Sequence, residues 1–278
     1  MSDPVAGPLA ALTGWPVPNA AAAVIGPSGV VASHGDLARP FPLASVTKPL
    51  AALAVLVAVE EEAVSLADPA DEQLVPGATV RHLLAHASGL APEKPLRSFA
   101  PAQRRVYSNV GIELAASLVG EAARMPFAQY LDEAVVRPLG LTGTSLAGSP
   151  ARDGVSTVAD LARVAHELLS STGLLSGPMR DDLATVQYPG LRGVLPGFGA
   201  QDPNDWGLGF EIRGGKSPHW TGAHNSPATF GHFGQSGTLL WVDPEVSLAL
   251  VVLTDRDFGD WARAAWPALA DAVLDAYA

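Results

Sequence analysis

The sequence predicts an α+β fold in which both ends of the chain build one antiparallel sheet, flanked by helices, around an inserted all-helical domain. Apolar runs flank turn-forming residues near the N-terminus and again near the C-terminus, whereas apolar residues in the middle recur at helical spacing. We therefore expect a sheet domain from residues 1–66 and 200–278 and a helical domain from residues 67–199. A functional site is expected in the cleft between them.

The first elements are a hairpin and a buried helix. Apolar runs at 20–25 and 30–33 are separated by Gly26-Pro27-Ser28-Gly29, a turn-forming sequence. Proline is tolerated only in the first turn of a helix, so Pro49 predicts a helix that begins at about Ser45. The apolar run 50–59 that follows is shorter than the ~20 residues needed to cross a bilayer. We expect a core helix here and no membrane segment.

The middle of the chain has the periodicity of amphipathic helices. Between about Thr79 and Leu183 the apolar residues recur at three- and four-residue spacing. Thr157 and Asp160 have the spacing of a capping box, which predicts a helix beginning there.

The last third returns to strands and ends in a helix. We expect strands at 207–212, 238–242 and 248–253, the last two joined by the turn Asp243-Pro244-Glu245. A final helix is expected over 260–277, with a kink at Pro267.

Composition excludes several classes of protein. The chain of 278 residues has 28 Asp and Glu against 17 Lys and Arg, a net charge of -11, and it collects no basic stripe, so nucleic acid is not an expected partner. The absence of cysteine excludes disulfides, thiolate metal sites and a cysteine nucleophile. No basic residue precedes the short apolar patch at the N-terminus, as it would in a secretory signal, so we expect a cytoplasmic protein.

The tetrapeptide Ser45-Val46-Thr47-Lys48 stands at the expected helix start. A serine hydroxyl there lies among unpaired N–H groups, which favour a developing oxyanion. Lys48 follows on the same face and can accept the proton of Ser45 if burial lowers the pKa of its ammonium. The structural alternative is an ordinary serine N-cap with an exposed lysine. The apolar run after Lys48 favours a buried lysine.

Two further stretches carry candidate groups. In Tyr107-Ser108-Asn109 a phenol could relay protons and an amide could orient a substrate, although this stretch by itself favours a turn in which Asn109 caps a helix. The stretch from Gly231 to Gly237 contains His232 and enters the strand at 238–242. Its glycines would let a substrate or a second backbone approach closely; the alternative is a β-bulge with a structural histidine.

Together, and in this order, the three motifs resemble those of the serine β-lactamase and penicillin-binding-protein superfamily. Further segments are similar to its class C β-lactamase and family VIII esterase branch: FPLA at 41–44, TVRHLLAHASGL at 79–90, WGLGF at 206–210 and WVDP at 241–244. The resemblance covers residues from about 20 to 255. It implies the β-lactamase/transpeptidase-like fold, with the active site in the predicted cleft.

The resemblance also implies roles for residues. Ser45 would be the acylated nucleophile, Lys48 its proton acceptor, and Tyr107 a second acid and base. Asn109 would hold the substrate and Lys48, and His232 would stand where many relatives have lysine. The backbone N–H groups of Ser45 and Gln235 would form the oxyanion hole. Substrate contacts are expected from Phe233, Gly234 and Trp220.

His232 bears on the substrate class. A histidine is mostly neutral at pH 7, so the permanent cation that would bind a substrate carboxylate is missing. We therefore expect a serine hydrolase that forms an acyl-enzyme on a small ester or amide, without metal or cofactor. The alternatives are a β-lactamase or D,D-peptidase, an acyltransferase, and a non-catalytic relative that binds a ligand or a partner. The sequence does not indicate the oligomeric state.

Two other features of the sequence are candidate sites. His82 and His86 stand four apart, but the segment HLLAH lacks the glutamate of a zincin, so no metal site is expected. The loop 214–229 contains His219, Trp220 and His224 and is either a lid that supplies aromatic contacts or an ordinary surface loop.

Overall fold

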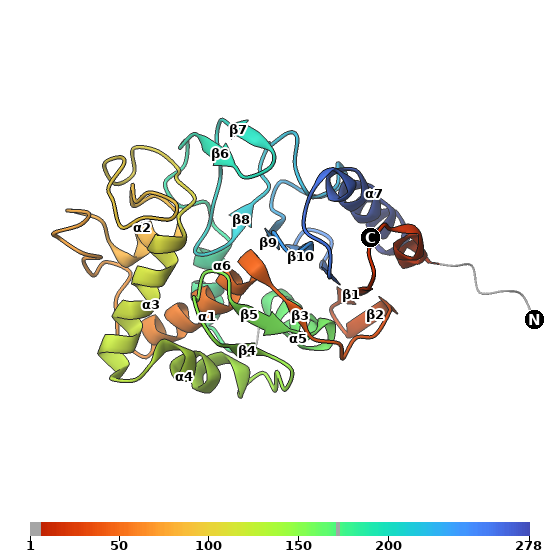
Figure 1. Ribbon diagram of the computed structural model, residues 1–278, viewed down its shortest axis with the longest axis horizontal. Helices are drawn as coiled ribbons and strands as arrows, with labels where there is room; N and C mark the ends of the chain where they lie inside the picture. The colour runs from red at the N-terminus through yellow and green to blue at the C-terminus, as the bar shows by residue number, and fades with distance from the viewer. Residues whose placement is uncertain (1–6, 171–172) are drawn as a thin grey trace, which may run out of the picture.

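The computed structural model describes residues 7–170 and 173–278 and contains a six-stranded antiparallel sheet built from both ends of the chain (Figure 1). The strand order is β2-β1-β11-β10-β9-β8. These strands are β1 (Ala20–Gly26), β2 (Gly29–His34), β8 (Glu211–Ile212), β9 (Phe230–Gly234), β10 (Thr238–Asp243) and β11 (Leu248–Thr254). N-terminal β1 pairs with C-terminal β11 from Ala20 opposite Thr254 to Ile25 opposite Ala249. The predicted α+β class and the sheet from both termini are confirmed.

Both faces of the sheet are covered, which explains why its central strands are apolar without alternation. Ala22 and Val24 of β1 face a cluster with η1 (Pro8–Gly14) and α7 (Asp260–Tyr277). The alternate residues of β1 join the larger core with α1 (Thr47–Glu60) and α5 (Val158–Leu169). The final helix has its predicted bounds and includes Pro267.

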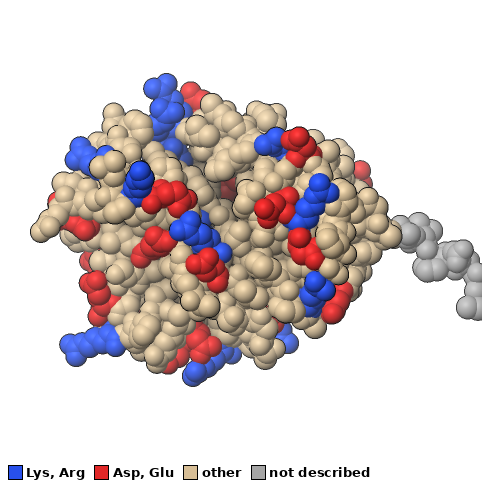
Figure 2. Space-filling model, viewed as in Figure 1, with Lys and Arg blue, Asp and Glu red and all other residues tan. Residues whose placement is uncertain are grey.

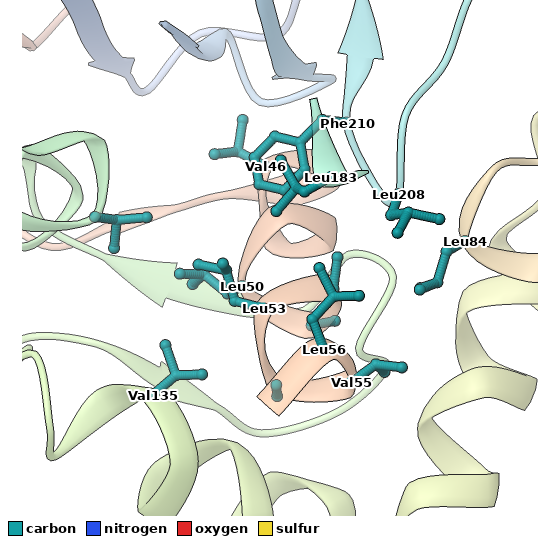
Figure 3. Close-up of a cluster of buried hydrophobic side chains, with 14 of the residues drawn as sticks. Val46, Leu50, Leu53, Val55, Leu56, Leu84, Val135, Leu183, Leu208 and Phe210 are labelled. Atoms are coloured by element: carbon teal, nitrogen blue, oxygen red, sulfur yellow. The ribbon is translucent and has the colours of Figure 1, made fainter. Parts of the chain in front are cut away.

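Helix α1 runs through the larger core and is buried along nearly its whole length (Figure 3). Leu50, Leu53 and Leu56 are each at most 1% exposed. A helix that is apolar on all sides must be covered on all sides, so its lack of a polar face is explained. Helix α1 begins at Thr47 and the short helix η2 (Ala44–Val46) precedes it, so the predicted start at Ser45 falls in η2. Within the described residues, no helix combines the length and the apolar character needed to span a membrane.

The middle of the chain differs from the predicted all-helical domain. It contains the expected helices α2 (Val80–Leu84), α3 (Asn109–Ala123), α4 (Phe127–Leu131), η3 (Asp132–Val136) and α6 (Gly177–Leu183). It also contains short strands. β5 (Gly154–Ser156) pairs with β3 (Phe41–Pro42) on one side and with β4 (Ser145–Leu146) on the other, and β6 (Gly193–Leu195) and β7 (Gly199–Gln201) form a hairpin. Helix α5 packs on β1 and β11 of the large sheet. The domain boundaries at 66/67 and 199/200 stay a prediction.

Two local predictions are corrected by tertiary contacts. The strand expected at 207–212 is reduced to β8, because Gly209 turns at φ +83° and packs against Ala52 of α1. The capping box at α5 is half formed: Thr157 accepts the Asp160 N–H at 3.1 Å. The Asp160 carboxylate instead accepts from Gly143 N and Thr144 Oγ1, both at 2.8 Å, and so fastens the loop before β4 to the start of α5.

Candidate active site

Ser45 lies in η2, directly before α1, and its hydroxyl is the meeting point of two other predicted groups. Lys48 Nζ donates to Ser45 Oγ at 3.1 Å, and the Tyr107 hydroxyl donates to the same oxygen at 2.7 Å. Ala44, immediately before the serine, has φ +46°, in the left-handed region that is strained for a residue with a Cβ. The chain therefore turns sharply to present Ser45.

Lys48 is completely buried, as its place before the apolar run predicted. Besides Ser45, its ammonium donates to the Ala151 carbonyl at 2.8 Å and lies 4.6 Å from the centre of the Tyr107 ring. Burial lowers the pKa of Lys48 to about 7, with the Glu93 carboxylate acting in the opposite direction. A substantial fraction of Lys48 is therefore neutral at physiological pH and able to accept a proton.

Tyr107 precedes α3 and is held among aromatic rings. The ring centroid of His86 lies 4.7 Å from it, that of Trp206 5.7 Å and that of His232 5.8 Å. Burial raises the pKa of Tyr107 above its ordinary value, although the hydrogen bond with Ser45 favours the phenolate. The phenol is therefore protonated at rest and is placed as a proton donor.

Asn109 is the first residue of α3, but it does not cap that helix. Ser108 does so, because its hydroxyl accepts the Gly111 N–H at 3.1 Å. Asn109 Nδ2 donates to Glu93 Oε1 at 2.5 Å, and its buried Oδ1 has no partner among the described residues. No hydrogen bond joins Asn109 to Lys48 in the described part of the chain; the Ala151 carbonyl holds the ammonium instead.

His232 lies on β9, buried, with its ring 5.8 Å from that of Tyr107. Its Nδ1 lies 2.7 Å from the Phe233 carbonyl oxygen, and its Nε2 is buried without a partner among the described residues. Burial lowers the pKa of His232 to about 3, with a further contribution from the Lys48 charge. The ring is neutral, with Nδ1–H as the donor and Nε2 as a free acceptor.

Gly234 allows β9 to pack directly on the segment that carries the serine. A Cβ atom at Gly234 would overlap the Leu43 carbonyl oxygen and would lie 3.2 Å from Ser45 N. The contact is reinforced where Thr238 Oγ1 donates to the Leu43 carbonyl at 2.8 Å and Ser236 Oγ donates to the Pro42 carbonyl at 2.7 Å. The backbone at Ser45 and the end of β9 therefore lie side by side.

A cavity of about 400 Å³, here called the central cavity, opens over these groups. Its lining residues are Ala44, Ser45, Glu93, Tyr107, Asn109, Arg152, Leu195, Pro196, Trp206, Glu211, His232, Phe233 and Gln235. Figure 2 shows a hollow on this face, with acidic and basic side chains mostly in neighbouring pairs around it. One such pair belongs to the lining, because Arg152 Nη1 lies 3.0 Å from Glu93 Oε2. The structure therefore assembles Ser45, Tyr107, Asn109, His232 and Gln235 in one site.

Of the predicted substrate contacts, Phe233 and Gly234 lie at the site and Trp220 does not. Phe233 lines the central cavity, and Gly234 acts through the close approach of β9 to Ser45. Trp220 does not line the cavity: it is 1% exposed and its indole N–H donates to Glu211 Oε2 at 2.6 Å. The expectation for Trp220 is corrected because its ring packs into the core between the sheet and α7.

The loop 214–229 is packed against the body of the protein rather than placed as a lid. Ser226 Oγ donates to the Asp243 carboxylate at 2.6 Å, and Thr229 Oγ1 does so at 2.8 Å. On its outer side, His224 Nδ1 lies 2.8 Å from Asp275 Oδ1 of α7. These contacts hold the loop against β10 and α7.

Glu211 is a site residue that the sequence analysis missed. It lines the central cavity and is nearly fully buried, with Lys216 Nζ and His219 Nε2 each 2.9 Å from its Oε1. Burial alone would raise the pKa of Glu211, but Lys216 and His219 hold it below its ordinary range. The sequence offered one signal for Glu211, an acidic residue directly after the apolar WGLGF segment. A glutamate in such a place needs a partner, because this residue is rarely buried without one.

The two histidines weighed as metal ligands have structural contacts. His82 Nδ1 is 2.9 Å from Thr79 Oγ1 at the start of α2, and His86 Nδ1 accepts the Ser108 N–H at 3.2 Å. The His86 ring supports Tyr107, a role the sequence analysis missed, as it did that of Trp206. Within residues 7–170 and 173–278, no three His, Asp or Glu side chains gather in a way that could hold a metal ion.

Comparisons with known proteins agree with this geometry. The family model described as Beta-lactamase matches residues 14–274. The crystal structure of a beta-lactamase from Mycobacterium bovis is 59% identical, with 97% of this chain and 99% of that chain covered and a TM-score of 0.94. Unliganded simvastatin synthase from Aspergillus terreus shares the fold at 17% identity and a TM-score of 0.76, with 96% of each chain covered.

A curated relative matches over a shorter region. Penicillin-binding protein 4* of Bacillus subtilis (strain 168) is 28% identical over 134 residues, which are 37% of this chain. The match spans 30% of the length of that relative. The family model alone covers nearly the whole chain, and the fold and the assembled motifs agree with it, so this chain belongs to the beta-lactamase family.

Proposed function

We propose that this protein is a serine hydrolase that forms an acyl-enzyme on Ser45 and acts on a small ester or amide. One observation carries the proposal. The Ser45 hydroxyl lies within hydrogen-bond distance of two buried proton-transfer groups, Lys48 Nζ at 3.1 Å and the Tyr107 hydroxyl at 2.7 Å. A pure binding site has no need of this arrangement.

In the proposed acylation, neutral Lys48 takes the proton of Ser45 as Oγ attacks the substrate carbonyl carbon. The pKa of about 7 suits Lys48 to this role near neutral pH. The resulting oxyanion accepts hydrogen bonds from the backbone N–H groups of Ser45 and Gln235. This role is supported by the close packing of β9 on η2 at Gly234.

The bond from the carbonyl carbon to the leaving oxygen or nitrogen then breaks, and Tyr107 donates its proton to the leaving atom. Its raised pKa keeps the phenol protonated until that moment. The protonated Lys48, 4.6 Å from the ring centre, restores the proton to the phenolate. In deacylation a water oxygen attacks the acyl carbon and gives a proton to the same pair. The bond from that carbon to Ser45 Oγ then breaks, the pair returns the proton to Oγ, and the acid is released.

The charges around the central cavity favour a neutral substrate. His232 is neutral, and Glu93 and Glu211 contribute carboxylates to the lining. Among the described lining residues, Arg152 is the permanent cation, and its guanidinium is paired with Glu93 at 3.0 Å. A substrate carboxylate would therefore meet no unpaired cation among the described lining residues.

β-Lactam turnover is a second candidate function. The Mycobacterium bovis protein that is 59% identical over nearly the whole chain is described as a beta-lactamase. A β-lactam would acylate the same Ser45, so the two candidates differ in substrate and share the chemistry.

Covalent labelling tests the proposal. The protein is incubated with a fluorophosphonate and, separately, with a penicillin, and its intact mass is measured, with Ser45→Ala as the matched control. We expect a fluorophosphonate adduct that is absent from Ser45→Ala. A lasting penicillin adduct, or rapid penicillin hydrolysis, would favour the second candidate. No adduct with either reagent would overturn the hydrolase proposal and leave the central cavity as a binding site.

A further inference from the structure

A second cavity, here called the side groove, adjoins the central cavity. Its volume is about 620 Å³ and its lining residues are Pro92, Glu93, Phe99, Arg104, Arg105, Val106, Tyr107, Val194 and Pro196. Glu93, Tyr107 and Pro196 line both cavities. The two cavities therefore adjoin at these three residues, one of which is Tyr107.

The walls of the side groove are mainly apolar and come from two separate segments. Pro92 and Phe99 lie in the loop that follows α2, whereas Val194 and Pro196 lie in the hairpin of β6 and β7. Val194 is 53% exposed, so its side chain is open to contact with a ligand. Five of the nine lining residues are apolar and lie along one open groove beside the serine, so the surface suits an apolar part of a ligand.

Buried Arg105 connects the two segments that form the walls of the side groove. It is 1% exposed, and its guanidinium donates to the backbone carbonyls of Ala85 at 2.5 Å, Gln187 at 2.7 Å and Asn204 at 3.0 Å. Its own backbone N–H donates to the Arg192 carbonyl at 3.0 Å, and Gly193 packs too closely on it to admit a side chain. The side groove is thus preformed, so binding there spends little free energy on ordering the walls.

We propose that the side groove binds the leaving-group side of the substrate, namely the alkyl or aryl part of its alcohol or amine. This inference rests on the proposed function, in which Tyr107 protonates the leaving atom. The leaving atom must then lie at the Tyr107 hydroxyl, and Tyr107 is the one proposed proton-transfer residue that lines both cavities. The acyl part remains in the central cavity beside His232 and Phe233. The substrate class is therefore a short acyl ester or amide of a hydrophobic alcohol or amine.

A pair of isomeric esters separates the two sides of the substrate. Hexyl acetate and ethyl hexanoate have the same atoms, but the first carries its alkyl chain on the leaving alcohol and the second on the acyl group. Hydrolysis of each is followed by acid release at constant pH, beside ethyl acetate as the short reference. Each methylene that leaves water is worth about a three- to fourfold gain in kcat/KM. We expect kcat/KM for hexyl acetate to exceed that for ethyl hexanoate by about tenfold or more.

Variants at an exposed position test the location. Val194→Asp should lower the ratio of kcat/KM for hexyl acetate over ethyl acetate by about tenfold, because it places a carboxylate on the apolar wall. Val194→Ile keeps the wall apolar and should preserve the ratio. Val30→Asp is the matched control, since Val30 is 51% exposed on β2 and lines neither cavity. It should leave both rates unchanged.

The outcomes are distinguishable from failure of the proposed function. Equal or faster hydrolysis of ethyl hexanoate, or a ratio unaffected by Val194→Asp, overturns the side-groove assignment while the Ser45 adduct and ethyl acetate hydrolysis stand. Absence of both the adduct and ester hydrolysis overturns the proposed function, and the side-groove assignment with it.

Discussion

At the scale of single residues, the chemistry depends on the protonation state of Lys48. The side chain is fully buried, has hydrogen bonds to Ser45 and to the Ala151 carbonyl, and lies near Glu93 and Arg152, whose charges act on it in opposite directions. Burial outweighs these neighbours and lowers the pKa of the ammonium to about 7. A lysine, ordinarily charged at neutral pH, is thereby available as a base.

This pKa predicts the pH dependence of the reaction. Lys48 must be neutral to take the proton of Ser45, so kcat/KM for ester hydrolysis should rise with pH and be half-maximal at about pH 7. The measurement is a kcat/KM profile from pH 5.5 to 9, with the spontaneous hydrolysis subtracted. Lys48→Ala should lower kcat/KM by about 10²- to 10⁴-fold because it removes the base. A profile that is flat or falls between pH 6 and 8 would contradict this role.

At the scale of elements, the site is made where β9 packs on η2 and α1. The contact has no side chain at Gly234, and the hydroxyls of Ser236 and Thr238 fasten the following turn and strand to Pro42 and Leu43. Strand β9 also carries His232 and leads to Gln235, so small shifts of this strand move two proposed site groups together. Precise packing of the two elements is therefore a condition for activity.

Gly234→Ala should damage both stability and activity. The new methyl group would overlap the Leu43 carbonyl oxygen and push β9 away from Ser45, which should cost about 1–3 kcal/mol of unfolding free energy and reduce ester hydrolysis strongly. Urea denaturation and kcat/KM measure the two effects. Gly14→Ala is the matched control: a Cβ there meets nothing within 4 Å, so both values should stay close to those of the parent protein. Equal behaviour of the two variants would refute the packing argument.

At the scale of the whole molecule, folding encloses several titratable groups that are rarely buried. Glu211 and Lys216 form a buried ion pair, and His219 Nε2 lies 2.9 Å from the same carboxylate. Burial lowers the pKa of His86, His219 and His232. The Glu211 carboxylate acts in the opposite direction on His219, whereas the Nε2 atoms of His86 and His232 have no hydrogen-bond partner in the described part of the chain. The folded structure therefore holds the rings of His86 and His232 neutral.

Stability should therefore fall on mild acidification. Below pH 6.5 the unfolded chain binds protons at both His86 and His232, whereas the folded protein does not until the pKa of each buried ring is reached, about 3 for His232. The unfolded state then binds more protons, so the free energy of unfolding decreases by up to about 1.4 kcal/mol per pH unit for each histidine. Urea denaturation at pH 7.5 and 5.5 measures the change.

A variant isolates one contribution to this slope. His232→Gln should show a smaller loss of stability between pH 7.5 and 5.5 than the parent protein, since it lacks one of the buried rings whose pKa is lowered. His34 on β2 is only partly buried, and His34→Gln, which keeps His86 and His232, is the matched control. If the parent protein were equally stable at both pH values, the neutral state of the buried histidines would be refuted.

The sequence alone predicted many of the elements and predicted that Ser45, Lys48 and Tyr107 lie together. The hairpin of β1 and β2, the strands β10 and β11 and the helix α7 follow from local patterns of apolar and turn residues, which act over a few residues. Ser45 and Lys48 could be paired for the same reason, since three residues at a helix start place both side chains on one face. The motif Tyr107-Ser108-Asn109 predicted that Tyr107 belongs to the same site. The structure places the Tyr107 hydroxyl 2.7 Å from Ser45 Oγ.

Tertiary structure decided what depends on contacts between distant segments. It reduced the predicted strand at 207–212 to β8, directed Trp220 into the core and gave Glu211 its buried partners. It also formed the side groove from two segments that are about ninety residues apart. Local patterns predict which residues form an element, because backbone preference and periodicity are properties of neighbours. Burial, pKa and cavity shape are set by which elements pack together, and only the folded chain determines that.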